Sequence, residues 1–217
     1  MTDQNRLNIF LESLDPDFPQ WITGIEQYGR ANQIPLVKRE TAALLLFMLR
    51  MKKAVKVLEI GTAIGFSAVL MAAETESIKE ITTIEIRPEH AALARKNFAL
   101  AHQNGVGAEF ILLERDASQL LPQLTGQFDL VFLDAAKAQY AAWLPDIKRL
   151  LIPGGVLFAD NVLQEGTLLE PRFLIERRDR TIHKRIREYL YDVRHDNELT
   201  TVILPVGDGA AISIKNE

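Results

Sequence analysis

The chain has 217 residues, of which 47% are hydrophobic and 25% are charged, and these values argue against a disordered chain or a membrane protein. We expect one domain over residues 1–217, with an N-terminal helical cap over about residues 1–51. The formal net charge of −4 gives no overall attraction to nucleic acid, so a polyanion site would have to be a local basic patch.

The chain contains no cysteine, which excludes a disulfide framework and a cysteine metal site. Its start, Met1 to Arg6, lacks the basic residues and apolar core of a signal peptide, and no apolar stretch reaches membrane-spanning length. We therefore expect a cytoplasmic protein.

The first part of the chain is predicted to be helical. Asn5 to Tyr28 has apolar residues at loosely helical spacing and predicts two short helices, interrupted around Asp15 to Asp17. Lys38 to Met51 predicts a helix whose middle, Ala42 to Leu49, is apolar on nearly all sides. We expect this helix to be buried under the sheet or to take part in a homodimer contact.

From Val55 onwards, predicted strands and helices alternate. The predicted strands are Val55–Ile60, Glu80–Ile86, Glu109–Leu113, Phe128–Leu133 and Gly155–Ala159. The predicted helices are Gly65–Ala73, Pro88–Asn104, a short helix after Asp116, and Gln139–Leu151. This alternation is typical of an α/β fold with a parallel sheet and helices on both faces.

The C-terminal part follows a different pattern. Arg177 to His195 predicts a long helix, and Leu199–Pro205 and Ala210–Lys215 predict two strands. The turn between these strands is too short for a parallel crossover, so they must be antiparallel.

Two glycines follow the first predicted strand, in the run from Val57 to Ser67. A strand, a tight turn and a helix start are expected here, where free backbone N–H groups can hold an anionic ligand. The spacing Gly61-x-x-x-Gly65 differs from the G-x-G-x-x-G of dinucleotide enzymes, which disfavours a dinucleotide oxidoreductase. A turn that binds nothing is the alternative.

The pattern E-x-G-x-x-x-G, from Glu59 to Gly65, resembles motif I of the class I S-adenosylmethionine (SAM) methyltransferases. The resemblance implies a Rossmann-like, seven-stranded, mostly parallel sheet closed by an antiparallel C-terminal hairpin. It also implies that Glu59, Gly61 and Gly65 border the amino acid end of SAM and that Ser67 reaches its carboxylate.

Further candidates for cofactor contact lie at later strand ends. Glu85 stands about 20 residues after Gly65, where a carboxylate can accept both hydroxyls of a ribose. The loop after the third strand resembles the adenine-contacting loop of catechol-type O-methyltransferases. Candidate contacts there, in the loop before the helix at Lys38 and after the fourth strand are Asp116, Ala117, Ser118, Val37 and Asp134.

Polar and charged side chains follow the fourth and fifth strands. Asp134 and Lys137 come just after one, and Asp160 and Asn161 just after the other. Neighbouring parallel strands lie about 5 Å apart, so Asp134, Asp160 and Asn161 would converge as ligands of a hard cation such as Mg²⁺. Alternatively, each Asp only caps a helix.

This set resembles the metal site of the cation-dependent O-methyltransferases of the catechol and caffeoyl-CoA type. The resemblance implies that the cation lowers the pKa of the acceptor hydroxyl, and that Lys137, beside Asp134, takes the proton or stabilises the oxyanion. A solvated Lys137 and a catalytically silent SAM-binding protein are the alternatives.

Within this family, the chain resembles the bacterial tRNA 5-hydroxyuridine methyltransferases, which methylate the wobble position to 5-methoxyuridine. The matching runs are Leu58–Gly65, Asp134–Lys137, Asp160–Leu163 and Pro205–Gly209. A basic strip that could bind tRNA phosphates includes Arg177, Arg178, Arg180, Lys184 and Arg185. The alternatives are a solvated helix face and a small catechol-like phenol as the acceptor.

Overall fold

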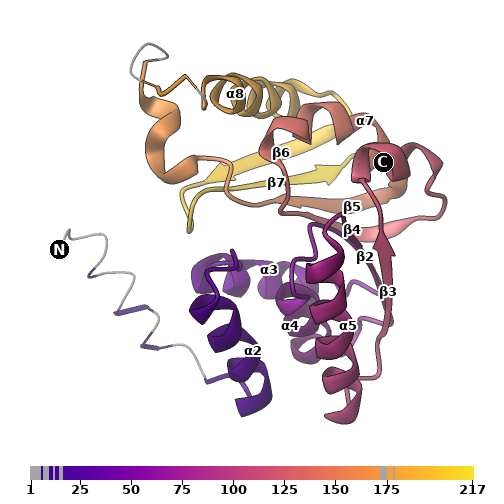
Figure 1. Ribbon diagram of the computed structural model, residues 1–217. Helices are drawn as coiled ribbons and strands as arrows, with labels where there is room; N and C mark the ends of the chain where they lie inside the picture. Colours follow the sequence, from indigo (N-terminus) through magenta and orange to yellow (C-terminus); the bar gives the residue numbers. More distant parts are fainter. Residues whose placement is uncertain (1–5, 7–9, 12, 15–16, 172–174, 178) are drawn as a thin grey trace.

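The computed structural model describes residues 6, 10–11, 13–14, 17–171, 175–177 and 179–217. Its centre is one seven-stranded sheet with the strand order β3-β2-β1-β4-β5-β7-β6 (Figure 1). The strands are β1 (Lys56–Ile60), β2 (Glu80–Glu85), β3 (Glu109–Glu114), β4 (Phe128–Leu133), β5 (Leu151–Ala159), β6 (Leu199–Leu204) and β7 (Ala210–Lys215).

The sheet is parallel except at its C-terminal edge. β1 pairs in parallel with β2 and β4, and β4 pairs in parallel with β5. β7 runs antiparallel between β5 and β6, so the last two strands form the expected hairpin. The predicted class I methyltransferase fold is confirmed. The strand order reverses direction at β1 and β4, which is where ligands of open α/β sheets bind.

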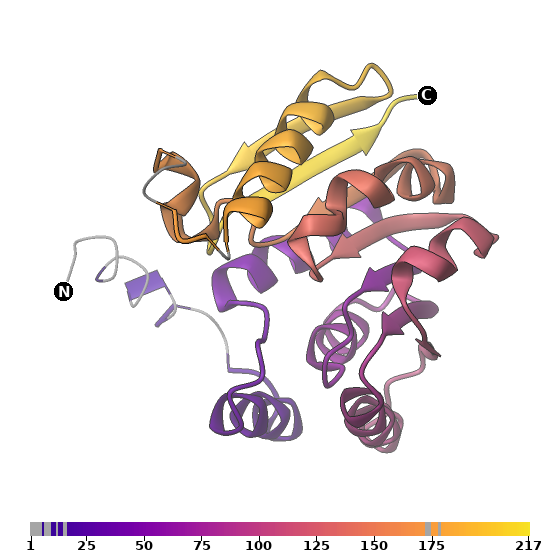
Figure 2. The ribbon, with the colours of Figure 1, turned by 45° about the horizontal axis from the view of Figure 1, so that its top comes forward.

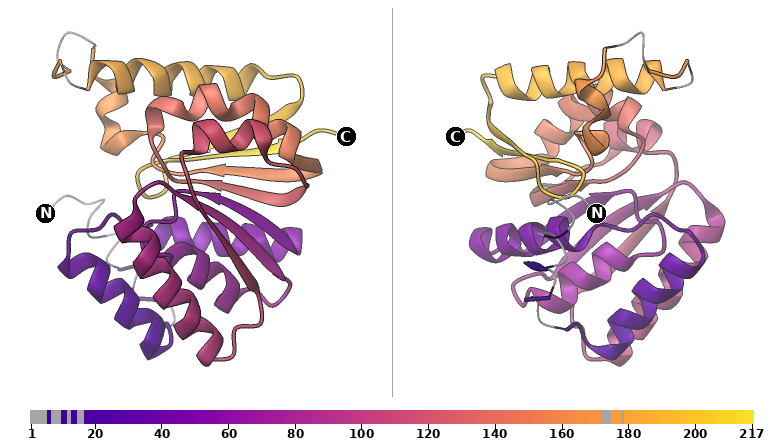
Figure 3. Two further views of the ribbon diagram at one scale, coloured as in Figure 1. Left: turned by 45° about the vertical axis from the view of Figure 1, so that its right-hand side comes forward. Right: turned by 90° about the vertical axis from the view of Figure 1, so that its left-hand side faces the viewer.

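Helices cover both faces of this sheet (Figure 3). One face is covered by α2 (Gln20–Ala31), α3 (Arg39–Lys52), α4 (Phe66–Glu74) and α5 (Pro88–Gln103). The other is covered by α6 (Ala117–Leu120), α7 (Tyr140–Leu150) and α8 (Arg180–His195), and Figure 2 shows α8 lying along the β6–β7 edge. Short 3₁₀ turns are η1 (Leu121–Gln123), η2 (Lys137–Gln139) and η3 (Gln164–Leu169).

Each face has its own hydrophobic core, because successive strand side chains point to opposite faces. On β1, Val57 belongs to the core under α2 to α5, whereas Leu58 and Ile60 belong to the core under α6 to α8. Burial on both faces explains why the parallel strands are apolar runs without alternation.

One sequence expectation differs from the structure. β5 begins at Leu151, not at Gly155, because Leu151 pairs with Phe128 of β4 before the glycines. α3 buries one side against the core, whereas its Phe47 and Met51 are each 61% exposed, so the dimer contact stays a prediction.

In the N-terminal cap, the second expected helix is α2, whereas the first falls mostly on residues outside those described. Among the described residues, no helix combines the length and the apolar character needed to cross a membrane.

Candidate active site

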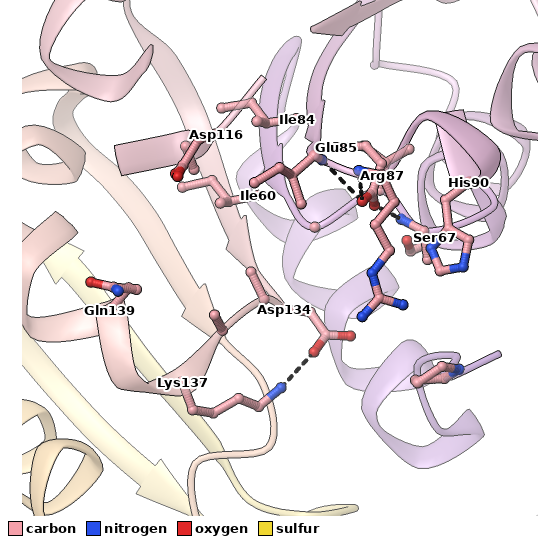
Figure 4. Close-up of a pocket in the computed structure, with 18 of the residues that line it drawn as sticks. Ile60, Ser67, Ile84, Glu85, Arg87, His90, Asp116, Asp134, Lys137 and Gln139 are labelled. Atoms are coloured by element: carbon pink, nitrogen blue, oxygen red, sulfur yellow. Dashed lines mark hydrogen bonds and ion pairs between the residues drawn. The ribbon is translucent and has the colours of Figure 1, made fainter. Parts of the chain in front are cut away.

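A cleft of about 530 Å³ opens where β1, β2, β3 and β4 end (Figure 4). Nine of the residues proposed from the sequence line it: Val37, Gly61, Ser67, Glu85, Asp116, Ala117, Ser118, Asp134 and Lys137. Glu59, Gly65, Asp160 and Asn161 do not line it. Glu59 and Gly65 are next to lining residues, whereas Asp160 and Asn161 follow β5, which pairs with β4. The loops at these strand ends therefore assemble most of the expected residues around one cavity.

The turn after β1 is fixed by three backbone hydrogen bonds. The N–H groups of Gly61 and Thr62 both donate to the carbonyl oxygen of Ile84, at 3.1 Å each. The N–H of Gly65 donates to the carbonyl oxygen of Thr62 at 2.7 Å, and α4 starts at the next residue. The start of a helix thus faces the cleft, where its free N–H groups favour a negatively charged ligand group.

Packing inside the protein requires glycine at both motif positions. A Cβ on Gly61, whose φ is +105°, would lie 2.0 Å from the carbonyl oxygen of Asp134. A Cβ on Gly65, whose φ is +80°, would lie 2.7 Å from the ring of Phe98 on α5. Gly61 therefore lets the turn after β1 touch the end of β4, and Gly65 lets α4 pack on α5.

Glu59 lies beneath the cleft and has no exposed surface. Its carboxyl group receives hydrogen bonds from the hydroxyls of Ser67 and Thr83, at 2.5 Å each. Burial raises the pKa of this carboxyl to about 8, although both hydroxyls oppose the shift. Glu59 thus orients Ser67, and Ser67 itself lines the cleft.

Glu85 ends β2 and is held by backbone N–H groups. Oε2 accepts from Ala63 at 2.8 Å, and Oε1 accepts from Ile86 at 3.0 Å and from Arg87 at 2.9 Å (Figure 4). The carboxylate is fixed at the wall of the cleft, where it can still accept hydrogen bonds from ligand hydroxyls.

The loop after β3 closes another side of the cleft. Asp116 caps α6 by accepting a hydrogen bond from the N–H of Ser118 at 2.8 Å. The Ser118 hydroxyl accepts a hydrogen bond from Trp143 Nε1 at 3.0 Å. Trp143 also lines the cleft, although the sequence analysis did not propose it as a site residue. It lies one turn after Tyr140 on the same side of the amphipathic helix α7, and this spacing could have indicated it. Other lining residues not proposed from the sequence include Arg87, His90 and Gln139.

Asp134 and Lys137 form an ion pair at the end of β4, with 2.8 Å between Lys137 Nζ and Asp134 Oδ1 (Figure 4). The side chains are only 28% and 17% exposed, respectively, so water screens this pair less than it would at the surface. The pairing also fixes the ammonium group at the cleft, since both residues line it.

Asp160 is the counterpart of Asp134 on the neighbouring strand, because the residues before them, Leu133 and Ala159, are paired. Asp160 is 5% exposed. Burial, and next the negative charge of Asp134, raise the pKa of its carboxyl to about 7. A cation between these carboxylates would favour their charged forms and so oppose both causes of the raised pKa.

The segment after Asp160 is held by the β6–β7 turn. Asn161 has a φ of +57°, a left-handed conformation that asparagine adopts more readily than most residues. The N–H of Val162 donates to the carbonyl oxygen of Gly209, and that of Leu163 to the carbonyl oxygen of Asp208, at 2.9 Å each. The C-terminal hairpin thus supports the loop that carries Asp160.

The two carboxylates and the Asn161 amide are a donor set that fits a hard cation. A cluster of three or more His, Cys, Asp or Glu side chains suited to a metal is absent from the described part of the chain. Any cation here would therefore depend on Asp134, Asp160 and the amide, with open positions for other ligands.

The basic strip is partly structural. The guanidinium group of Arg180 donates to the carbonyl oxygen of Ile175 at 2.9 Å, and that of Arg185 to the carbonyl oxygen of Ala138 at 3.1 Å. Lys184 forms an exposed ion pair with Glu188 at 3.4 Å, and Arg177 is exposed. Arg178 lies outside the described residues. Arg177, Lys184 and Arg185 are exposed, but the Arg185 guanidinium group already supports a carbonyl oxygen, so Arg177 and Lys184 suit phosphate contact best.

Known proteins resemble this chain over nearly its whole length. A family model described as O-methyltransferase matches residues 25–216. A catechol O-methyltransferase of Niastella koreensis is 35% identical over 122 residues, which is 54% of this chain and 54% of that relative. The match therefore spans about half the length of that protein.

Solved structures share the fold. The SAH-bound methyltransferase PaMTH1 of Podospora anserina superposes with a TM-score of 0.86 at 26% identity, covering 100% of this chain and 97% of the other. The SAM complex of the O-methyltransferase TomG of Streptomyces achromogenes, which takes part in tomaymycin synthesis, gives a TM-score of 0.83 at 25% identity and covers 100% of both chains. With the cleft at the switch point of this sheet, these matches show that the chain belongs to the O-methyltransferase family and is a SAM-dependent enzyme.

Proposed function

We propose that this protein transfers the SAM methyl group to one oxygen of a vicinal oxygen pair on a planar ring, with the help of a divalent cation such as Mg²⁺. The observation that carries this proposal is the Asp134–Lys137 ion pair. It joins a carboxylate and an ammonium group at the edge of the cofactor cleft, just after β4. Asp160 follows β5, the strand that pairs with β4.

The loops around the cleft suit the parts of SAM. Glu85, held by three N–H groups, would accept the ribose hydroxyls, and the loop of Asp116, Ala117 and Ser118 would border the adenine. The turn after Gly61, together with Ser67 and Val37, would hold the amino acid end. Glu59 and Gly65 would act through the position of Ser67 and α4.

Asp134, Asp160 and Asn161 would hold the cation, which when bound supplies a Lewis acid that lowers the pKa of the acceptor hydroxyl. Lys137 would take the proton or stabilise the negative oxygen, because its ammonium group is already fixed at the cleft. Positioning the acceptor oxygen in line with the SAM methyl would supply most of the remaining acceleration.

A small catechol-like phenol is the acceptor that the relatives favour, because the Niastella protein is named a catechol O-methyltransferase. Its two adjacent hydroxyls would provide the oxygen pair.

The 5-hydroxyuridine of tRNA is the second candidate, and its 5-hydroxyl and 4-carbonyl oxygens are likewise adjacent. It is favoured by the matching runs such as Asp160–Leu163 and by exposed cations at Arg177 and Lys184. A single-stranded base can enter a pocket of this kind.

The decisive experiment offers both acceptors to the purified protein. Labelled methyl transfer from SAM is measured to bulk tRNA from a strain lacking this protein and to a catechol, each with and without EDTA, and the tRNA is then digested to nucleosides. EDTA-sensitive 5-methoxyuridine supports the tRNA acceptor, whereas methylated catechol with unlabelled tRNA supports the phenol. Transfer that survives EDTA in every reaction contradicts the role of the cation.

We also propose that the protein is a cytoplasmic homodimer. The homodimer is supported by exposed apolar side chains on and after α3, which include Phe47, Met51 and Val55.

A further inference from the structure

Tyr140 is the first residue of α7, and its side chain is completely buried behind the site. Its hydroxyl donates to the carbonyl oxygen of Leu133 at 3.1 Å and accepts from the N–H of Ala135 at 3.2 Å. These two residues flank Asp134. The same hydroxyl lies 3.5 Å from the carbonyl oxygen of Asp160. One side-chain oxygen therefore contacts the backbone of both loops that carry the candidate cation ligands.

The ring of Tyr140 contacts Lys137 of the candidate site and Tyr189 of the hydrophobic core. Lys137 Nζ lies 5.9 Å from the ring centroid, within the range of a cation–π interaction. Tyr189 of α8 packs against the same ring edge-to-face, with 5.3 Å between the centroids. The hydroxyl and the ring thus have separable roles, because the ring contacts do not need the oxygen.

The hydrogen bonds at Tyr140 resist separation of the two loops. β4 and β5 are already joined there by the Asp160 N–H, which donates to the carbonyl oxygen of Leu133 at 3.0 Å. The Tyr140 hydroxyl adds a second link at the same place, because it donates to the carbonyl oxygen of Leu133 and lies 3.5 Å from that of Asp160. Without it, the Ala135 N–H would lose its acceptor in a site that is only partly open to water.

We propose that Tyr140 is a positioning residue that sets the spacing between Asp134 and Asp160 and thereby the affinity of the site for a divalent cation. The inference rests on the proposed function, since it takes these carboxylates as cation ligands. Tyr140 does not line the cleft, so it acts through the two loops and not on SAM.

The chain provides a matched control in Tyr189. It is also fully buried and lies in the same core, but its hydroxyl has no hydrogen-bond partner in the described structure. Both Tyr140→Phe and Tyr189→Phe remove one buried oxygen and keep the ring. Only the first removes contacts with the loops of Asp134 and Asp160.

The experiment measures Mn²⁺ binding to the full chain by the EPR signal of free Mn²⁺, and SAM binding by calorimetry in EDTA. Loss of one hydrogen-bonded link corresponds to roughly a tenfold weaker Mn²⁺ affinity in Tyr140→Phe. We expect its SAM affinity to stay within about twofold of wild type, because the Tyr140 hydroxyl bonds to the backbone at the ends of β4 and β5 and not to the cofactor loops after β1, β2 and β3. Tyr189→Phe should leave both affinities unchanged.

Several results would overturn the inference. Wild-type Mn²⁺ affinity in Tyr140→Phe would do so and leave the proposed function standing. Equal losses in the two variants, a parallel loss of SAM affinity, or failure of Tyr140→Phe to fold would each point to general packing instead. If the wild-type protein itself bound no Mn²⁺ and its activity resisted EDTA, the proposed function would fail together with this inference.

Discussion

Gly61 and Asp134 are in direct backbone contact, since a Cβ on Gly61 would come within 2.0 Å of the Asp134 carbonyl oxygen. The cofactor turn and the loop of the candidate cation ligand therefore occupy one continuous backbone surface. A side chain added at Gly61 would therefore displace the loop of Asp134.

Replacing Gly61 with Ala should markedly lower the unfolding temperature of the protein and abolish methyl transfer. The left-handed φ and the clash together are expected to cost roughly 2–4 kcal/mol. Gly107→Ala is the control, because nothing lies within 4 Å of its added Cβ. Thermal unfolding by circular dichroism measures both, and a Gly61→Ala protein as stable as Gly107→Ala would refute the contact.

Glu59 should make stability depend on pH. Its pKa is about 8 in the folded chain, against an ordinary value of 4.5, so the folded state binds more protons between these values. The stability from the protonated carboxyl is complete below pH 4.5 and is lost as the pH rises through 8, a difference of several kcal/mol. Glu59→Gln should remove this dependence, so that its stability relative to wild type increases from pH 5 to pH 9.

Chemical denaturation at several pH values tests this expectation. Glu109→Gln, on the exposed start of β3, is the control and should keep the wild-type pH dependence. Parallel curves for wild type and Glu59→Gln would mean that Glu59 is already charged at neutral pH.

Removing the Lys137 ammonium should slow the chemical step with little effect on the cofactor. We expect Lys137→Met to lower kcat by roughly 10²–10⁴-fold, because a positioned acid–base group typically contributes that much. The affinity for SAM should stay near that of wild type. Lys184→Met, on the exposed face of α8, is the matched control for the small-molecule acceptor. An unchanged kcat in Lys137→Met would return this lysine to a purely structural role.

The exposed cations of the basic strip test the tRNA acceptor. If tRNA is the substrate, replacing both Arg177 and Lys184 by Ala should raise KM for tRNA. The slope of log KM against log salt concentration should fall by about the value of two phosphate contacts. KM for a catechol should not change. Arg185→Ala is unsuitable for this purpose, because its guanidinium group supports the carbonyl oxygen of Ala138 beside Lys137.

The homodimer can be tested on α3. Phe47→Asp places a charge on a side chain that is already 61% exposed, so the single chain should keep its fold. A dimer built on α3 should then dissociate to monomers in sedimentation velocity. If Phe47→Asp and wild type sediment identically as dimers, the contact lies elsewhere.

Most of the fold could be predicted because its signals are local. Parallel strands buried on both faces are apolar runs, and the short turn at Gly207 dictates an antiparallel hairpin. The start of β5 was missed because it depends on the pairing of Leu151 with Phe128, which are distant in sequence. The Pro153–Gly155 run, which follows Leu151, is typical of a turn and hid the start of the strand.

Side-chain direction limited the prediction of the site. Motif spacing brought Glu59 near the cofactor, but alternation along β1 puts it on the same face as Val57, toward Ser67. The basic strip has a similar limit. Helical spacing in α8 cannot distinguish Lys184, which is exposed, from Arg180, which donates to a carbonyl oxygen of its own chain.

The hydrogen bonds from Val162 and Leu163 to the β6–β7 turn have a consequence for synthesis on the ribosome. The first four strands can pair as they emerge, but the loop after Asp160 gains its support only when residues up to Gly209 have left the exit tunnel. On the proposed function, a nascent chain would complete the SAM cleft before it completes the cation site.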